Sequence, residues 1–185
     1  MSGHSKWSQI KRQKNVTDAA KSRVFARFAR SLTVESKKAN GIWAAPGLAA
    51  VIARAKAANM PKENIERAIA KGTSRDAGAL EQVIYEAYGP GGTAIIVGAF
   101  TDNKNRTTQE IKHVFAVSGV EIASPGAASW AFTKSPDGSY EPNGPLMDLS
   151  NEDGEKLGVV LDALDEHDDI QHVYTNARGY ENLGD

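Results

Sequence analysis

The sequence has no cysteine among its 185 residues. This absence excludes disulfide bonds, zinc sites built on thiolates and a thiol nucleophile. Long apolar runs are missing too, so no segment offers the roughly 20 consecutive apolar residues of a membrane-spanning helix. The opening stretch MSGHSKWSQIKRQK has charges with no apolar stretch behind them, which does not fit a secretory signal. We therefore expect a cytoplasmic protein with no membrane partner.

Histidine is scarce and scattered, with four residues in the whole chain. His167 and His172 flank two aspartates, but no zinc-binding spacing such as HExxH occurs. Nothing in the sequence resembles a nucleophile accompanied by a base and an orienting group. The sequence predicts a structural or surface role for the histidines, and it predicts no catalytic residues, no metal site, no cofactor and no small-molecule substrate.

The net charge of −1 hides a strong segregation of charge along the chain. Residues 1–75 carry 16 Lys and Arg against 4 Asp and Glu, and residues 76–185 carry 6 against 19. The two parts therefore have net charges of +12 and −13. A cationic module attracts phosphates and speeds encounter with nucleic acid. The acidic part is either a solvated face or a docking surface for a basic partner.

Residues 1–75 have the pattern of a basic helical domain. Apolar residues from Val24 to Leu32 follow helical spacing, while Arg23, Arg27 and Arg30 recur on one face as a basic stripe. Thr17-Asp18 can start this helix, and Asn40-Gly41 can end it. Further helices are expected from Pro46 and from near Pro61, since proline is tolerated in a first turn. The expected module is a three-helix bundle.

Residues 73–80 have linker composition, so residues 76–185 are expected to form a second, acidic α+β domain. Trp130 and Phe132 are expected to share one face of a strand. The predicted order indicates an antiparallel or mixed sheet with its helices on one face. The predicted strands cover 83–88, 93–101, 120–123, 127–133, 146–149 and 169–175, with helices capped by Asn105 and Ser150.

The basic N-terminal segment mixes cations, hydrogen-bonding side chains and one indole, which is typical of a nucleic-acid-binding arm. A solvated basic tail with its indole packed on the helices is the alternative. Lys104 and Arg106, at the start of a helix, form a predicted secondary contact for phosphate, with ordinary helix capping as the alternative. The predicted nucleic-acid-binding residues are His4, Lys6, Trp7, Lys11, Arg12, Lys14, Lys21, Arg23, Arg27 and Arg30.

Four long motifs, in order along the chain, resemble the YebC/PmpR family: GHSKWSQIKRQK, KAANMPKENIERAIAKGT, YEAYGPGGTAIIVGAFTDNKNRT and DDIQHVYTN. The resemblance covers nearly the whole chain. It implies a helical N-terminal domain followed by a ferredoxin-like α/β sandwich. It also implies a role in gene expression, either as a DNA-binding transcriptional regulator or as a ribosome-associated translation factor that binds ribosomal RNA or tRNA and relieves stalling at sequences such as consecutive prolines.

One departure from the family is expected. Similar proteins carry a further α/β domain after the strand that ends at Phe132, whereas residues 134–145 here are a short, turn-rich replacement. The sequence does not choose between DNA and ribosomal RNA, because no helix with base-reading side chains stands out. An enzyme acting on phosphates and a protein-binding adaptor using the acidic face are the rival classes.

Overall fold

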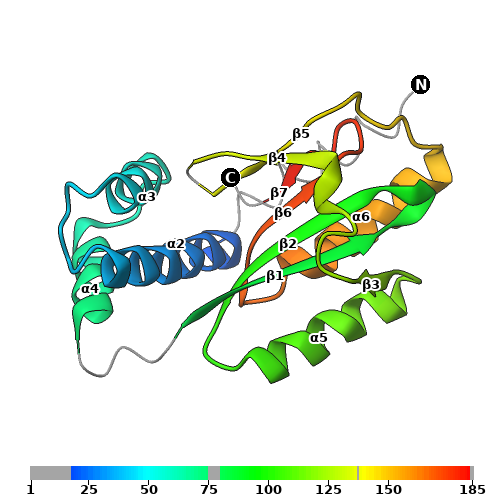
Figure 1. The fold of residues 1–185 in the computed structure, drawn as a ribbon. Coiled ribbons are helices and arrows are strands. Elements are labelled where there is room, and N and C mark those ends of the chain that lie inside the picture. Colours follow the sequence, from blue (N-terminus) through cyan, green and yellow to red (C-terminus); the bar gives the residue numbers. More distant parts are fainter. Residues whose placement is uncertain (1–17, 75–79, 137, 184–185) are drawn as a thin grey trace.

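A computed structural model describes residues 18–74, 80–136 and 138–183 of the chain. Three helices come first: α2 (Asp18–Lys38), α3 (Pro46–Ala57) and α4 (Lys62–Thr73). We call them the helical module. Figure 1 shows them together at one end of a sheet-containing part. The predicted helix end at Asn40-Gly41 is confirmed, because both residues have positive φ values of 49° and 76° just after α2.

The helical module has its own apolar core, which includes Leu32, Leu48 and Ile65. Helix α2 packs closely on α4, where a Cβ atom added to Gly72 would lie 2.4 Å from the carbonyl oxygen of Thr33. Ser36, which is buried, donates its hydroxyl to the carbonyl oxygen of Ile69 at 2.8 Å. This close approach requires glycine at position 72 and fixes α4 along the side of α2.

The rest of the described chain forms what we call the α/β module. Its five-stranded sheet has the order β3-β1-β2-β6-β7, and each pair of neighbouring strands is antiparallel. The strands are β1 (Glu81–Tyr88), β2 (Ala94–Thr101), β3 (Glu121–Ala123), β6 (Ile170–Thr175) and β7 (Asn182–Leu183).

Helices α5 (Lys104–Val117) and α6 (Asn151–Asp165) cover one face of this sheet. A second, two-stranded sheet of β4 (Phe132–Lys134) and β5 (Tyr140–Pro142) covers part of the other face. Strand β2 is buried along its whole length, since its side chains pack alternately on both layers. The predicted fold class, three helices followed by an α+β sandwich, is therefore confirmed.

Several local predictions were wrong. The strand expected at 127–133 is a 3-10 turn (η2, Ser129–Ala131) followed by β4. Trp130 and Phe132 consequently do not share a face, since Trp130 is 66% exposed and Phe132 is buried. Residues 146–149 are not a strand but make one isolated bridge, from Met147 to Ala177. Helix α5 is capped by Asn103, not by Asn105, because the Asn103 side chain accepts from the Arg106 N–H.

The cap at Ser150 is confirmed. Its hydroxyl oxygen accepts from the Asp153 N–H at 3.1 Å, and its hydroxyl donates to the Asp153 carboxylate at 2.7 Å. Across the described residues, no helix has the length and apolar character needed to cross a membrane.

Candidate nucleic-acid interface

Helix α2 carries the arginines of the predicted basic stripe, and two of them turn toward the α/β module. The Arg27 guanidinium contacts the Asp165 carboxylate at 2.8 Å and also donates to the Asp165 carbonyl oxygen. Arg30 lies 3.2 Å from the Asp169 carboxylate. Ser31 donates to the side-chain oxygen of Gln171 at 3.2 Å. We call these contacts the inter-module contact. They occupy two of the predicted phosphate-binding arginines with carboxylates of the same chain.

The other described residues of the prediction are open. Lys21 is exposed and Arg23 is partly exposed, and neither has an ion-pair partner within residues 18–74, 80–136 and 138–183. The N-terminal candidates His4, Lys6, Trp7, Lys11, Arg12 and Lys14 lie outside the described residues. The structure therefore describes four of the ten predicted residues. Arg27 and Arg30 form ion pairs with carboxylates, whereas Lys21 and Arg23 have no such partner among the described residues.

The predicted secondary contact is divided in the same way. Arg106 lies at 2.8 Å from Asp169, at 3.0 Å from Asp102 and at 3.8 Å from Glu110, so carboxylates surround it. The hydrogen bond to Asp169 raises the pKa of Arg106 above its ordinary value. Lys104 is exposed at the start of α5. Arg106 thus belongs to an internal ion-pair network.

Asp169 is the centre of that network and is 4% exposed. It accepts from Thr107 at 2.7 Å and from Arg106 at 2.8 Å, with Arg30 beside it. Burial opposes its ionisation, but these hydrogen bonds and the two positive charges outweigh burial and lower its pKa. Asp169 is therefore a carboxylate shared by α2 and α5.

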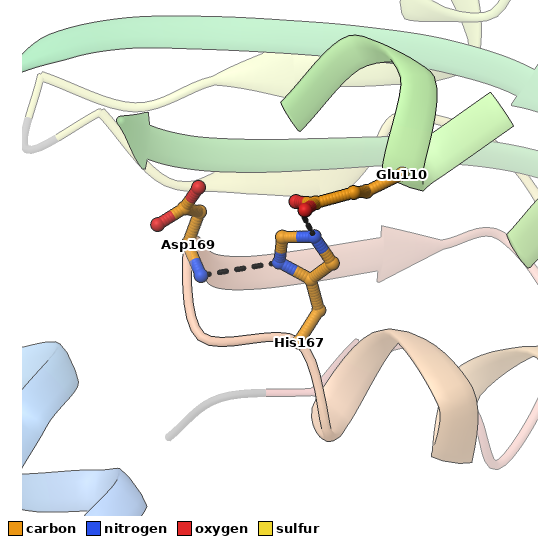
Figure 2. Close-up of side chains that lie close together, drawn as sticks. All are labelled: Glu110, His167 and Asp169. Atoms are coloured by element: carbon orange, nitrogen blue, oxygen red, sulfur yellow. Dashed lines mark hydrogen bonds and ion pairs between the residues drawn. The ribbon is translucent and has the colours of Figure 1, made fainter. Parts of the chain in front are cut away.

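Figure 2 shows Asp169 with Glu110 and His167, and one atom of each lies within 4.8 Å of the others, a spacing that could hold a metal ion. The His167 Nδ1 accepts from the Asp169 N–H at 3.1 Å, and its Nε2 lies 3.0 Å from the Glu110 carboxylate. Nε2 then carries the proton and donates to Glu110. Since the Asp169 carboxylate already meets two arginines, these atoms are engaged in ion pairs and hydrogen bonds instead of being open as ligands.

A cleft of about 600 Å³ lies between the modules beside this network. Four carboxylates line it, from Asp102, Glu110, Asp168 and Asp169. Arg30, Lys71 and Arg106 supply its positive charge. Its mixed lining does not favour a polyanion.

A second hollow lies between α2 and α4, and we call it the α2–α4 groove. Its volume is about 320 Å³, and Phe25, Ala29 and Met60 belong to its apolar lining. Its positive residues are Arg30, Arg67 and Lys71, and among the described residues no carboxylate lines it. Arg67 and Lys71 are exposed and have no ion-pair partner in the described part of the chain.

The sequence prediction missed both residues. Their signal was available, because Arg67 and Lys71 are four positions apart and so lie on one face of α4.

Matches to known proteins cover most of the chain. Residues 5–75 match the model of the TACO1/YebC protein N-terminal domain, and residues 80–136 match that of the TACO1/YebC second and third domain. A "Probable transcriptional regulatory protein" of Pelotomaculum thermopropionicum is 36% identical over 95% of this chain and 98% of its own length. A protein of the same name from Syntrophobacter fumaroxidans is 42% identical over 99% of this chain and 74% of its own.

The fold is also shared with a solved structure. A conserved hypothetical protein from Aquifex aeolicus superposes with a TM-score of 0.77 at 28% identity, covering 87% of this chain and 91% of the other. The alignment with the Pelotomaculum protein runs over 238 positions, more than the 185 residues present here, so that relative has residues without a counterpart in this chain. Taken with the helical and α/β modules described above, these matches show that the chain belongs to the TACO1/YebC family.

Proposed function

We propose that the protein is a DNA-binding regulator of gene expression that acts by binding and not by turnover. The observation that carries the proposal is the state of the cations in the helical module. Residues 18–74 hold 11 Lys and Arg against 4 Asp and Glu. Six of the eleven have no ion-pair partner among the described residues: Lys21, Arg23, Lys37, Lys56, Arg67 and Lys71.

Cations without partners support phosphate binding because nothing has to be broken before a phosphate approaches. Each contact releases condensed counterions, which supplies sequence-independent affinity. The names of the relatives, probable transcriptional regulatory proteins, agree with a nucleic-acid partner. The predicted contacts Lys6, Trp7 and Lys11 lie outside the described residues and stay a prediction.

Structured RNA, including that of the ribosome, is the second candidate. It is favoured by the α2–α4 groove, because proteins recognise RNA mostly through unpaired bases that stack on side chains. Because the short segment 134–145 stands where similar proteins carry a further α/β domain, the helical module would then make the principal contact with the RNA.

A salt titration tests the proposal. If six cations each meet one phosphate, log affinity for duplex DNA should fall with log salt at a slope of about −5. Replacing Lys21 and Arg23 with glutamine should make that slope less negative by about 2. The matched control is the pair Lys112→Gln and Lys134→Gln, which removes two exposed cations of the α/β module and should leave the slope unchanged. Absence of binding to both DNA and RNA at low salt would refute the proposal.

A further inference from the structure

We propose that the α2–α4 groove receives one unpaired nucleotide, with its base on the apolar floor and its phosphate between Arg67 and Lys71. This inference rests on the proposed function and narrows its ligand, from any phosphate backbone to one that presents an extruded base. The source can be a bulged DNA or a bulged RNA, since the recognising chemistry is the same.

The floor of the groove is apolar and open. Phe25 is partly exposed while it also packs on the core of the helical module, and Met60 is buried beneath it. Leu80 adds an apolar side chain next to the sheet. Every base has a flat π-face that stacks on such a surface without regard to sequence. An apolar floor at the bottom of a cationic groove therefore suits a base better than a phosphate alone.

The rim supplies the charge. Arg67 and Lys71 stand on successive turns of α4, and Arg30 faces the same groove from α2. Asn64, three residues before Arg67, lines the groove with an amide that can donate to and accept from a base edge. The order of groups along α4, amide and then two cations, matches the order of base and phosphate in a nucleotide.

The charge and the size of the α2–α4 groove both favour a nucleotide as its ligand. The neighbouring cleft has four lining carboxylates, whereas no described carboxylate lines the groove, so the groove favours a phosphate more than the cleft does. A volume of about 320 Å³ is at the small end of ligand sites, which are commonly about 300–1,000 Å³. The groove therefore fits one nucleotide and not a folded element of a partner.

The test compares an intact duplex with the same duplex carrying one unpaired adenosine, as DNA and as RNA, by fluorescence anisotropy with the full chain. We expect the bulged ligand to bind about tenfold more tightly. Ala26→Trp, on the exposed wall of the groove, should fill it without changing charge and abolish this preference while duplex affinity stays the same. Ala53→Trp on the exposed side of α3 is the matched control and should keep the preference.

Each outcome is decisive. If no ligand binds at all, the proposed function fails. If the duplex binds but the bulge gives no preference, or if Ala26→Trp keeps the preference with unchanged circular dichroism, the groove does not hold a base and the inference is overturned. The double variant Arg67→Ala and Lys71→Ala removes the site of one phosphate, so it should weaken the bulged ligand and make its salt slope less negative by about 1. An unchanged slope would overturn the phosphate assignment. A preference seen with RNA alone or DNA alone identifies the source.

Discussion

The helical module and the α/β module differ in how many cations they carry and in how many carboxylates surround those cations. Six of the eleven Lys and Arg residues of the helical module have no ion-pair partner among the described residues. In the α/β module, Arg106, Lys156 and Arg178 each lie within 3.0 Å of a carboxylate, while Lys104, Lys112 and Lys134 have no ion-pair partner among the described residues. A paired cation positions or stabilises its own fold, whereas an unpaired cation keeps its hydration until an external anion replaces it. The share of cations without a partner is similar in the two modules, so the helical module is distinguished by the number of such cations and by the few carboxylates near them.

The largest expected effect is on stability, and it is produced by substitutions in the core of each module. Leu32 and Leu161 are both fully buried, one in each module, so replacing either with alanine should lower the free energy of unfolding by about 2–5 kcal/mol. If binding belongs to the helical module, nucleic-acid affinity near the melting midpoint should fall for Leu32→Ala and stay for Leu161→Ala. Thermal unfolding followed by binding at graded temperatures measures both quantities. Equal loss of binding in the two variants would contradict the division of labour.

The inter-module contact offers the next effect. The Arg27 side chain is 13% exposed, so Arg27→Glu would place a carboxylate against Asp165 with little solvent to screen it. We expect the modules to separate, giving a larger radius of gyration by small-angle X-ray scattering. The swap of Arg27→Glu with Asp165→Arg should restore the compact form. A compact single variant would mean that packing, and not this ion pair, holds the modules together.

Asp165→Asn removes the negative charge that faces Arg27 without changing α2, and Arg27 keeps its hydrogen bond to the backbone carbonyl oxygen of residue 165. An arginine without its partner should join the unpaired set, so affinity for duplex DNA should rise about two- to fivefold at low salt and the salt slope should become more negative by about 1. Asp148→Asn, which releases Arg178 in the α/β module, is the control and should leave affinity unchanged. Anisotropy titrations at several salt concentrations measure both.

The smallest effect concerns pH. The pKa of Asp169 is lower in the folded protein than in the unfolded chain, where it is about 4. Ionised Asp169 therefore stabilises the folded state at pH values above about 4. This stabilisation is lost as the pH falls through the pKa of Asp169 in the folded protein. Lowering the pH from about 5 to about 3 should therefore loosen the contact with Arg30. Asp169→Asn should remove that part of the acid dependence. The measurement is the scattering radius against pH for the two proteins, and identical profiles would contradict the role of Asp169.

Local features could be predicted from the sequence because they depend on neighbouring residues. The C-terminal end of α2, the prolines at the starts of α3 and α4, and the Ser150 cap all follow from short-range backbone chemistry. The strand predicted at 146–149 does not form: the segment is apolar, but its backbone makes a single bridge instead of a ladder. Tertiary neighbours, which no local pattern contains, decide such a segment.

The candidate site was predicted only in part for the same reason. The arginine stripe of α2 was visible as a spacing, but 138 residues separate Arg27 from its partner Asp165. No periodicity indicates which cation will find a carboxylate at that distance along the chain. The α2–α4 groove also requires the packing angle of two helices, which Gly72 permits. Spacing predicted where the charge would gather, and the fold decided which charges remain available.

Asp169 also has a mechanical consequence, since one carboxylate is shared by Arg30 from the helical module and Arg106 from α5. If Arg30 moved to bind an external anion, Arg106 would remain beside Asp169 without the second described arginine. Binding of an anion to the helical module would then change the contacts of Arg106 at the start of α5 in the α/β module. By thermodynamic reciprocity, if the bound anion changes the strength of the Arg106–Asp169 pair, a change in that pair alters the affinity for the anion by the same factor.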